Sequence, residues 1–185
     1  MAPKIICVSG KVASGKTTLS KMTAEILRCN RFSVSDYLKT IAESQGHDII
    51  DRSLLQKLGE ECINKGWDKF AKDFLSFINY HKSQSYIIID GIRHIEFYRN
   101  ISKISSKHCV LVYIEVNDEV IFERLLLRGE INIDYSHIAE GNLSLIKGIS
   151  DYVLNGDSKD SETLTNELLQ KLGLDSITGA TLDNN

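Results

Sequence analysis

Four short apolar runs, each followed by a segment whose apolar residues have helical spacing, constrain the fold of this chain most strongly. The runs are KIICVS (4–9), YIIID (86–90), CVLVYIEV (109–116) and DYVLN (151–155). The segments that follow them are TTLSKMTAEILR (17–28), RHIEFYRNISKI (93–104), DEVIFERLLLR (118–128) and SETLTNELLQKLG (161–173). Strands that are apolar on both faces and alternate with helices are typical of a mainly parallel sheet covered on both sides.

The segment between the first helix and YIIID breaks this alternation. RFSVSD (31–36) can form a fifth, short strand. After it, the spacing of apolar residues predicts successive amphipathic helices in YLKTIAESQG, RSLLQKLGEECINKG and WDKFAKDFLSFINYHK. The sequence therefore predicts an α/β, three-layer sandwich with a mainly parallel five-stranded sheet and a helical insertion at about 36–82. Such an insertion usually covers a site or forms part of it.

Length and composition predict one globular domain. The chain has 185 residues, of which 42% are hydrophobic and 25% charged, so residues 1–175 can form a single domain followed by a polar tail at 176–185. The net charge of −3 disfavours nucleic acid or an anionic membrane as the partner. The chain has no apolar run of about 18 residues and no signal-peptide core, so we expect a cytoplasmic protein. Its four cysteines lack metal-binding spacing, and we expect them to be reduced and packed as small hydrophobic residues.

The loop between the first strand and the first helix carries the clearest chemical pattern. From Gly10 to Thr17 it reads GKVASGKT, which matches G-x-x-x-x-G-K-S/T. Glycines let the backbone N–H groups point inward, and the positive end of the helix attracts phosphate. The competing interpretation is a glycine turn that merely links strand to helix. Pattern, position and flanking elements together favour a polyphosphate site, in which Lys16 reaches the β- and γ-phosphates and Thr17 binds Mg²⁺.

An acidic residue follows on a second strand. Asp90 ends YIIID, where the acid that holds or orients Mg²⁺ stands in P-loop proteins. The alternative is an aspartate that caps the next helix. Arg93, three residues later, and Arg52 are further basic candidates for the site.

Two arginines precede a polar segment. Arg124 and Arg128 are four residues apart, so they project from one face of the predicted helix. The segment that follows them could fold over the site, and guanidinium groups stabilise charge on transferring phosphoryl oxygens. A solvated helix face paired with neighbouring glutamates accounts for the same spacing, and the spacing alone does not decide between the two.

Together these motifs resemble the P-loop nucleotide kinase family over nearly the whole chain. GKVASGKTT is similar to the family's phosphate loop, IIIDGIR to its acidic strand, FERLLLRG to its arginine-bearing helix, and SDYVLNGD to the strand and loop beside the adenine. SVSDYLK, LLQKLGEE and GWDKF are most similar to the acceptor-binding insertion of phage-type deoxynucleoside monophosphate kinases and dephospho-CoA-kinase-like proteins. The resemblance implies a P-loop kinase fold with a helical acceptor-binding insertion and a lid at about 129–148.

The resemblance also implies an activity and its residues. The activity is transfer of the γ-phosphoryl group of ATP, with Mg²⁺, to a small-molecule acceptor. ATP would be bound by Gly10, Ala13, Ser14, Gly15, Lys16, Thr17, Thr18, Asn155 and Gly156, and the metal by Thr17 and Asp90. Asp36 would contact or deprotonate the acceptor, and Arg52 and Arg93 would hold its anionic group. The catalytic set would be Lys16, Asp36, Arg124 and Arg128.

Four functions stay open at this stage. The first is a kinase of (deoxy)nucleoside monophosphates, and the second is a dephospho-CoA-type kinase. A third is a non-catalytic module that uses ATP binding to control a partner; the segment 129–142, which has no arginine, favours it. The fourth, a kinase acting on modified bases of DNA, is disfavoured by the net acidity of the chain.

Overall fold

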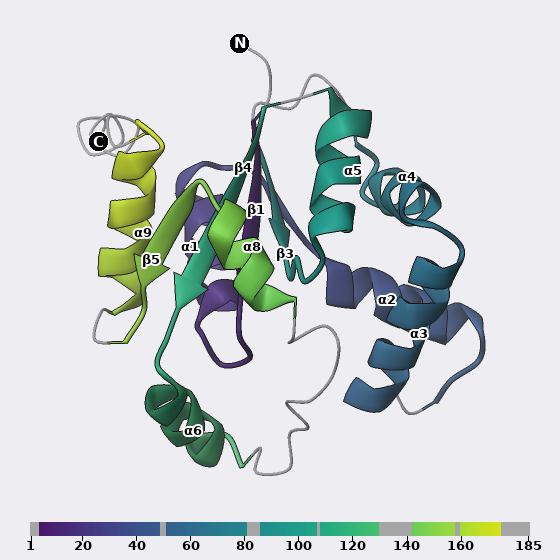
Figure 1. The fold of residues 1–185 in the computed structure, drawn as a ribbon, viewed down its shortest axis with the longest axis horizontal. Coiled ribbons are helices and arrows are strands. Elements are labelled where there is room, and N and C mark those ends of the chain that lie inside the picture. Colours follow the sequence, from purple (N-terminus) through teal and green to yellow (C-terminus); the bar gives the residue numbers. More distant parts are fainter. Residues whose placement is uncertain are drawn as a thin grey trace, which may run out of the picture.

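A computed structural model describes residues 4–48, 51–80, 86–106, 108–129, 142–157 and 160–174. Its centre is a sheet of five strands in the order β2-β3-β1-β4-β5, and all four pairings are parallel. The strands are β1 (Lys4–Gly10), β2 (Asn30–Ser33), β3 (Tyr86–Asp90), β4 (Cys109–Glu115) and β5 (Tyr152–Asn155). The predicted five-stranded α/β sandwich is confirmed, and Figure 1 shows helices on both sides of the sheet.

Each face of the sheet has its own apolar core, because successive side chains of a strand point to opposite faces. Ile5 and Cys7 of β1 belong to the core on one face. The helices that contribute to this core include α2 (Val34–Ser44), α4 (Trp67–Phe77), α5 (Ile95–Ser105) and α8 (Leu143–Ile149). Ile6 and Val8 belong to the opposite core. Its helices are α1 (Lys16–Ile26), α6 (Asp118–Leu127) and α9 (Ser161–Lys171).

The predicted insertion is helical, with one correction at its start. Its helices are α2 (Val34–Ser44), α3 (Arg52–Asn64) and α4 (Trp67–Phe77), which lie to one side of the sheet in Figure 1. The strand proposed for 31–36 ends at Ser33, because the Ser33 side chain accepts a hydrogen bond of 3.1 Å from the backbone N–H of Ser35 and caps α2. The last residues of the predicted insertion, 81–82, lie outside the described residues.

The C-terminal part of the segment predicted as a lid, about 129–148, is helical. Residues 143–149 form α8, and its Leu143 and Ile146 side chains are buried in the core beneath β1 and β4. This part of the segment is therefore a covering layer of the sheet. Residues 130–141 lie outside the described residues. Among the residues that the structure does describe, no helix is long and apolar enough to cross a membrane. All four cysteines are free thiols; Cys7 is buried, and Cys29, Cys62 and Cys109 are half-buried.

Candidate functional site: two adjoining ligand sites at the carboxyl edge of the sheet

The phosphate loop joins the end of β1 to the start of α1. Gly10 has φ +150°, and a Cβ atom there would lie 2.7 Å from Ser14 Oγ and 2.8 Å from the Ile114 carbonyl oxygen. The loop therefore requires glycine at this position, because no side chain fits between these atoms. Gly15, with φ +91°, precedes the helix, and Lys16 Nζ donates a hydrogen bond of 2.9 Å to the Lys11 carbonyl oxygen. The Lys16 side chain therefore folds back from the start of α1 onto the phosphate loop.

Asp90 lies beneath this loop with its side chain almost completely buried (3% exposed). Its Oδ2 atom accepts hydrogen bonds from Thr17 Oγ1 at 3.0 Å, Ser20 Oγ at 3.3 Å and Arg31 Nη2 at 2.7 Å. Its Oδ1 atom is buried and accepts no hydrogen bond from the described residues. A buried carboxylate oxygen in that position is an acceptor for a ligand that the protein itself does not supply.

The residues here fit Mg²⁺. This ion prefers oxygen ligands, keeps several waters and is usually held by one or two protein groups plus substrate phosphates. Thr17 Oγ1 and the Asp90 carboxylate provide such oxygens side by side at the head of α1. No cluster of three or more His, Cys, Asp or Glu side chains within the described part of the chain forms a complete metal cage. A metal that depends on a bound polyphosphate matches this arrangement.

Arg124 joins the phosphate loop to the loop after β5. Its guanidinium donates to the carbonyl oxygen of Ala13 at 3.3 Å and to that of Gly156 at 2.7 Å. A Cβ atom on Gly156 would lie 2.9 Å from Ile114 Cγ2 and 3.0 Å from Val116 Cγ2, so only glycine brings this loop so close to β4. The Asn155 side chain accepts a hydrogen bond of 2.9 Å from the Asp157 backbone N–H, which closes the turn. These contacts gather the predicted base-binding residues against the phosphate loop.

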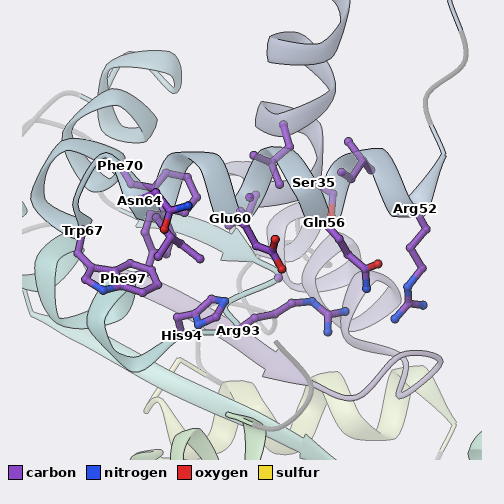
Figure 2. Close-up of a pocket in the computed structure, with 16 residues that line it drawn as sticks. Ser35, Arg52, Gln56, Glu60, Asn64, Trp67, Phe70, Arg93, His94 and Phe97 are labelled. Atoms are coloured by element: carbon purple, nitrogen blue, oxygen red, sulfur yellow. The ribbon is translucent and has the colours of Figure 1, made fainter. Parts of the chain in front are cut away.

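A cavity of about 340 Å³ lies between α2, α3, α4 and the β3–α5 segment. Figure 2 shows Arg52 and Arg93 extending toward one end of it, and the rings of Trp67, Phe70 and Phe97 gathered at the other. The Phe70 and Phe97 ring centroids are 4.6 Å apart, and the Trp67 and His94 centroids 5.1 Å. The cavity therefore has a cationic end and an aromatic end.

One face of α3 supplies polar groups along the whole cavity. They recur every fourth residue, so they stack on one side of the helix. They are Arg52, Gln56, Glu60 and Asn64. Figure 2 shows Glu60 between the cationic and the aromatic ends. A ligand along this face would meet a cation, then an amide and a carboxylate, and finally aromatic rings.

A single short segment connects the two sites. Asp90 ends β3 beneath the phosphate loop, while Gly91, Arg93 and His94 directly after it line the cavity. The Gly91 backbone N–H donates a hydrogen bond of 3.1 Å to the Val8 carbonyl oxygen, which ties this segment to the end of β1. Because the carboxyl ends of the parallel strands meet at the same edge, a ligand in the cavity would lie next to one in the phosphate loop.

The remaining predicted site residues lie as follows. Asp36 is on the first turn of α2, about half exposed, and pairs with Lys39 at 3.0 Å. It does not line the cavity, whereas its neighbour Ser35 does. Successive residues on a helix point about 100° apart, which accounts for the difference. Arg128 is exposed at the C-terminal end of α6, and Thr18 is exposed on the first turn of α1.

Four charged or amide side chains of these sites were not singled out as functional from the sequence. Arg31 binds Asp90, and Gln56, Glu60 and Asn64 line the cavity. Gln56, Glu60 and Asn64 could have been found from the sequence, because polar residues recur at every fourth position of α3. Arg31 had no such signal, because its partner is 59 residues away. Trp67 is half-buried and lines the cavity as well.

Comparison with known sequences gives one family and one distant relative. The AAA_18 family model, described as an AAA domain, matches residues 6–142, which include the phosphate loop, Asp90 and α3. A UPF0200/UPF0201 protein of Archaeoglobus fulgidus is 29% identical over 138 residues, or 74% of this chain. The chain spans only 42% of the length of that relative.

Comparison with solved structures shows the same fold in kinases. A gluconokinase from Sinorhizobium meliloti is similar with a TM-score of 0.61 and 14% identity, and covers 97% of this chain and 98% of its own. The shikimate kinase of Bacteroides thetaiotaomicron has a TM-score of 0.54 and 17% identity, with coverages of 94% and 100%. The chain therefore has the P-loop kinase type of α/β fold.

Proposed function

The chain belongs to the AAA_18 family of AAA domains, and from this premise we propose that it is an ATP-dependent phosphotransferase with a small anionic acceptor, most specifically a (deoxy)nucleoside monophosphate. ATP would bind in the phosphate loop with its base toward Asn155 and Gly156. Mg²⁺ would be held by Thr17 and oriented by Asp90.

One observation carries this proposal: the residues 90–94 contribute to both ligand sites. Asp90 belongs to the phosphate-loop site, and Arg93 and His94 belong to the cavity. Phosphoryl transfer requires donor and acceptor to be held in contact and in line. A module that only senses ATP needs no second cavity with two arginines beside the phosphate loop, so this arrangement favours an enzyme over a non-catalytic module.

The polarity of the cavity supports a nucleoside monophosphate as the acceptor. Its volume of about 340 Å³ is at the small end of the range for small-molecule sites. Arg52 and Arg93 present planar forks that match phosphate oxygens. At the other end, the half-buried Trp67 offers a flat face on which a base can stack. The amides and the carboxylate of α3 between them can hydrogen-bond the edge of a base or a sugar.

In this reaction an oxygen of the acceptor phosphate attacks the γ-phosphorus of ATP. The bond from that phosphorus to the β–γ bridging oxygen breaks, and ADP leaves with the electron pair of the broken bond. Lys16 holds the β- and γ-phosphates. Arg52 and Arg93 bind the anionic acceptor and offset its electrostatic repulsion by ATP. Mg²⁺, when bound, neutralises charge on the phosphates. A phosphate acceptor is already deprotonated at neutral pH, so this chemistry requires no general base at Asp36.

The experiment is an acceptor panel measured by ADP release in the presence of Mg²⁺. It contains the ribo- and deoxynucleoside monophosphates, dephospho-CoA and an oligonucleotide. We expect ADP formation that depends on a nucleoside monophosphate, together with the matching diphosphate as the second product. Lys16→Met should abolish both, with an unchanged circular dichroism spectrum as the control for folding.

The other outcomes distinguish the remaining functions. Turnover with dephospho-CoA alone would replace the proposed acceptor but keep the reaction. ATP binding without turnover on any member of the panel would contradict the enzyme and favour the regulatory module. Phosphorylation of the oligonucleotide alone would favour the kinase acting on DNA.

A further inference from the structure

Arg31 connects the edge strand β2 to the carboxylate beneath the phosphate loop. Its backbone is in register with Ile88 of β3, and its neighbour Phe32 packs against the core on the opposite face of the sheet. The Arg31 side chain is therefore directed to the α1 side. There its Nε donates to Ser20 Oγ at 2.9 Å and its Nη2 to Asp90 Oδ2 at 2.7 Å.

The guanidinium is the cation of an ion pair that is nearly closed to solvent. The Arg31 and Asp90 side chains are 17% and 3% exposed. A carboxylate at this depth requires a paired charge, and the other two donors to Asp90 are neutral hydroxyls. Arginine also fixes direction, because its planar fork holds Ser20 and Asp90 at the same time, which a lysine ammonium on a flexible stem does not.

The way in which Asp90 is held leaves one oxygen for a ligand. All three described donors reach Oδ2, so Oδ1 stays buried without a hydrogen bond from the described residues. The hydroxyl hydrogen of Thr17 is used by Asp90, which leaves the lone pairs of Thr17 Oγ1 for a cation. Arg31 and Ser20 help to hold the carboxylate in this orientation.

From this geometry we infer that Arg31 is a positioning residue for magnesium: it fixes Asp90 so that Oδ1 receives the metal or its bound water. The inference rests on the proposed function, since it concerns how Mg·ATP is bound. It assigns to the edge strand β2 a role in the nucleotide site that the phosphate-loop pattern does not contain. Groups that orient metal ligands commonly change metal affinity by about 10- to 100-fold when they are removed.

The experiment measures ATP binding by calorimetry in two conditions, excess Mg²⁺ and EDTA, for the full chain and three variants. Arg31→Met removes the charge and the fork, and Arg31→Lys keeps the charge alone. Lys72→Met removes an exposed lysine that pairs with Asp68 at 2.7 Å on α4, outside both sites, and is the matched control. Thermal unfolding without nucleotide shows whether each variant is folded.

We expect Arg31→Met to weaken Mg·ATP binding by about tenfold or more while its affinity for ATP in EDTA changes less than about twofold. Arg31→Lys should show an intermediate loss that is also confined to the magnesium condition, and Lys72→Met none. If Arg31→Met does not fold, the lysine variant decides by the same criterion. An equal loss in both conditions, or no loss in any folded Arg31 variant, overturns the inference. Absence of Mg·ATP binding by the unaltered chain would overturn the proposed function itself.

Discussion

Arg124 and Gly156 are joined by a hydrogen bond of 2.7 Å from the guanidinium of the arginine to the carbonyl oxygen of the glycine. The same guanidinium donates to the carbonyl oxygen of Ala13 in the phosphate loop. Arg124 therefore connects two loops. One is the loop after β5, which we expect to border the base, and the other is the phosphate loop. Both of these hydrogen bonds are with the walls of the nucleotide site, whereas the resemblance to the kinase family implies a role on the transferring phosphoryl group.

We therefore expect Arg124→Met to act mainly on ATP binding. The variant loses both hydrogen bonds of the guanidinium. Loss of even one charge-assisted hydrogen bond costs about 1.5 kcal/mol, so KM for ATP should rise by about tenfold or more. The measurement is steady-state kinetics with ATP varied at saturating acceptor, with Lys72→Met as the control. A change confined to kcat would contradict this role and restore the one predicted from the sequence.

Arg128 is exposed at the end of α6, and from the sequence we expect its charge to stabilise the transition state. We expect Arg128→Met to lower kcat by about 100-fold, with KM for both substrates changed less than about threefold. Single-turnover experiments would test whether the loss lies in the chemical step. An effect limited to KM would contradict a transition-state role.

The acceptor cavity predicts opposite results for two polar residues. Arg93 lines the cavity, so Arg93→Met should raise KM for the acceptor by about tenfold or more and leave KM for ATP nearly unchanged. Asp36 does not line it and pairs with Lys39 on the surface, so Asp36→Asn should keep kcat within about threefold. Kinetics with the acceptor varied test both. Complete loss of turnover in Asp36→Asn would support the acceptor contact that the sequence predicts.

Burial of the thiols predicts an alkaline limit to stability. Burial raises the pKa of Cys29 from its ordinary value of 9.0 to about 11, and that of the fully buried Cys7 well above its ordinary value. Between pH 9 and about 11 the unfolded chain therefore loses protons that the folded protein keeps. The free energy of unfolding should fall as pH rises through this range.

Urea denaturation at pH 8 and pH 10.5 measures this change, with Cys29→Ala as the comparison. The variant should lose less stability than the unaltered chain between the two pH values, because it lacks one of the titrating thiols. In the folded protein at pH 8, iodoacetamide should modify Cys29 more slowly than a free cysteine. An equal loss of stability in both proteins would show that Cys29 does not contribute to the alkaline limit.

The features that could be predicted from the sequence are those set by residues close together in the chain. The phosphate loop from Gly10 to Thr17 and the alternation of strands and helices are local patterns, and the five-stranded α/β fold follows from them. The boundary at Ser33 was predicted three residues too late, because a β-branched residue at Val34 favours a strand while the Ser33 cap starts a helix there.

The tertiary structure alone decided which distant side chains share a site. Arg31 meets Asp90 across 59 residues because β2 and β3 are neighbours in register, and Arg124 meets Gly156 because the fold brings α6 to the loop after β5. On α2, one helical step decides that Ser35 and not Asp36 lines the cavity. Local patterns are fixed by neighbours along the chain, whereas these contacts depend on strand order, register and the rotation of each helix on its sheet.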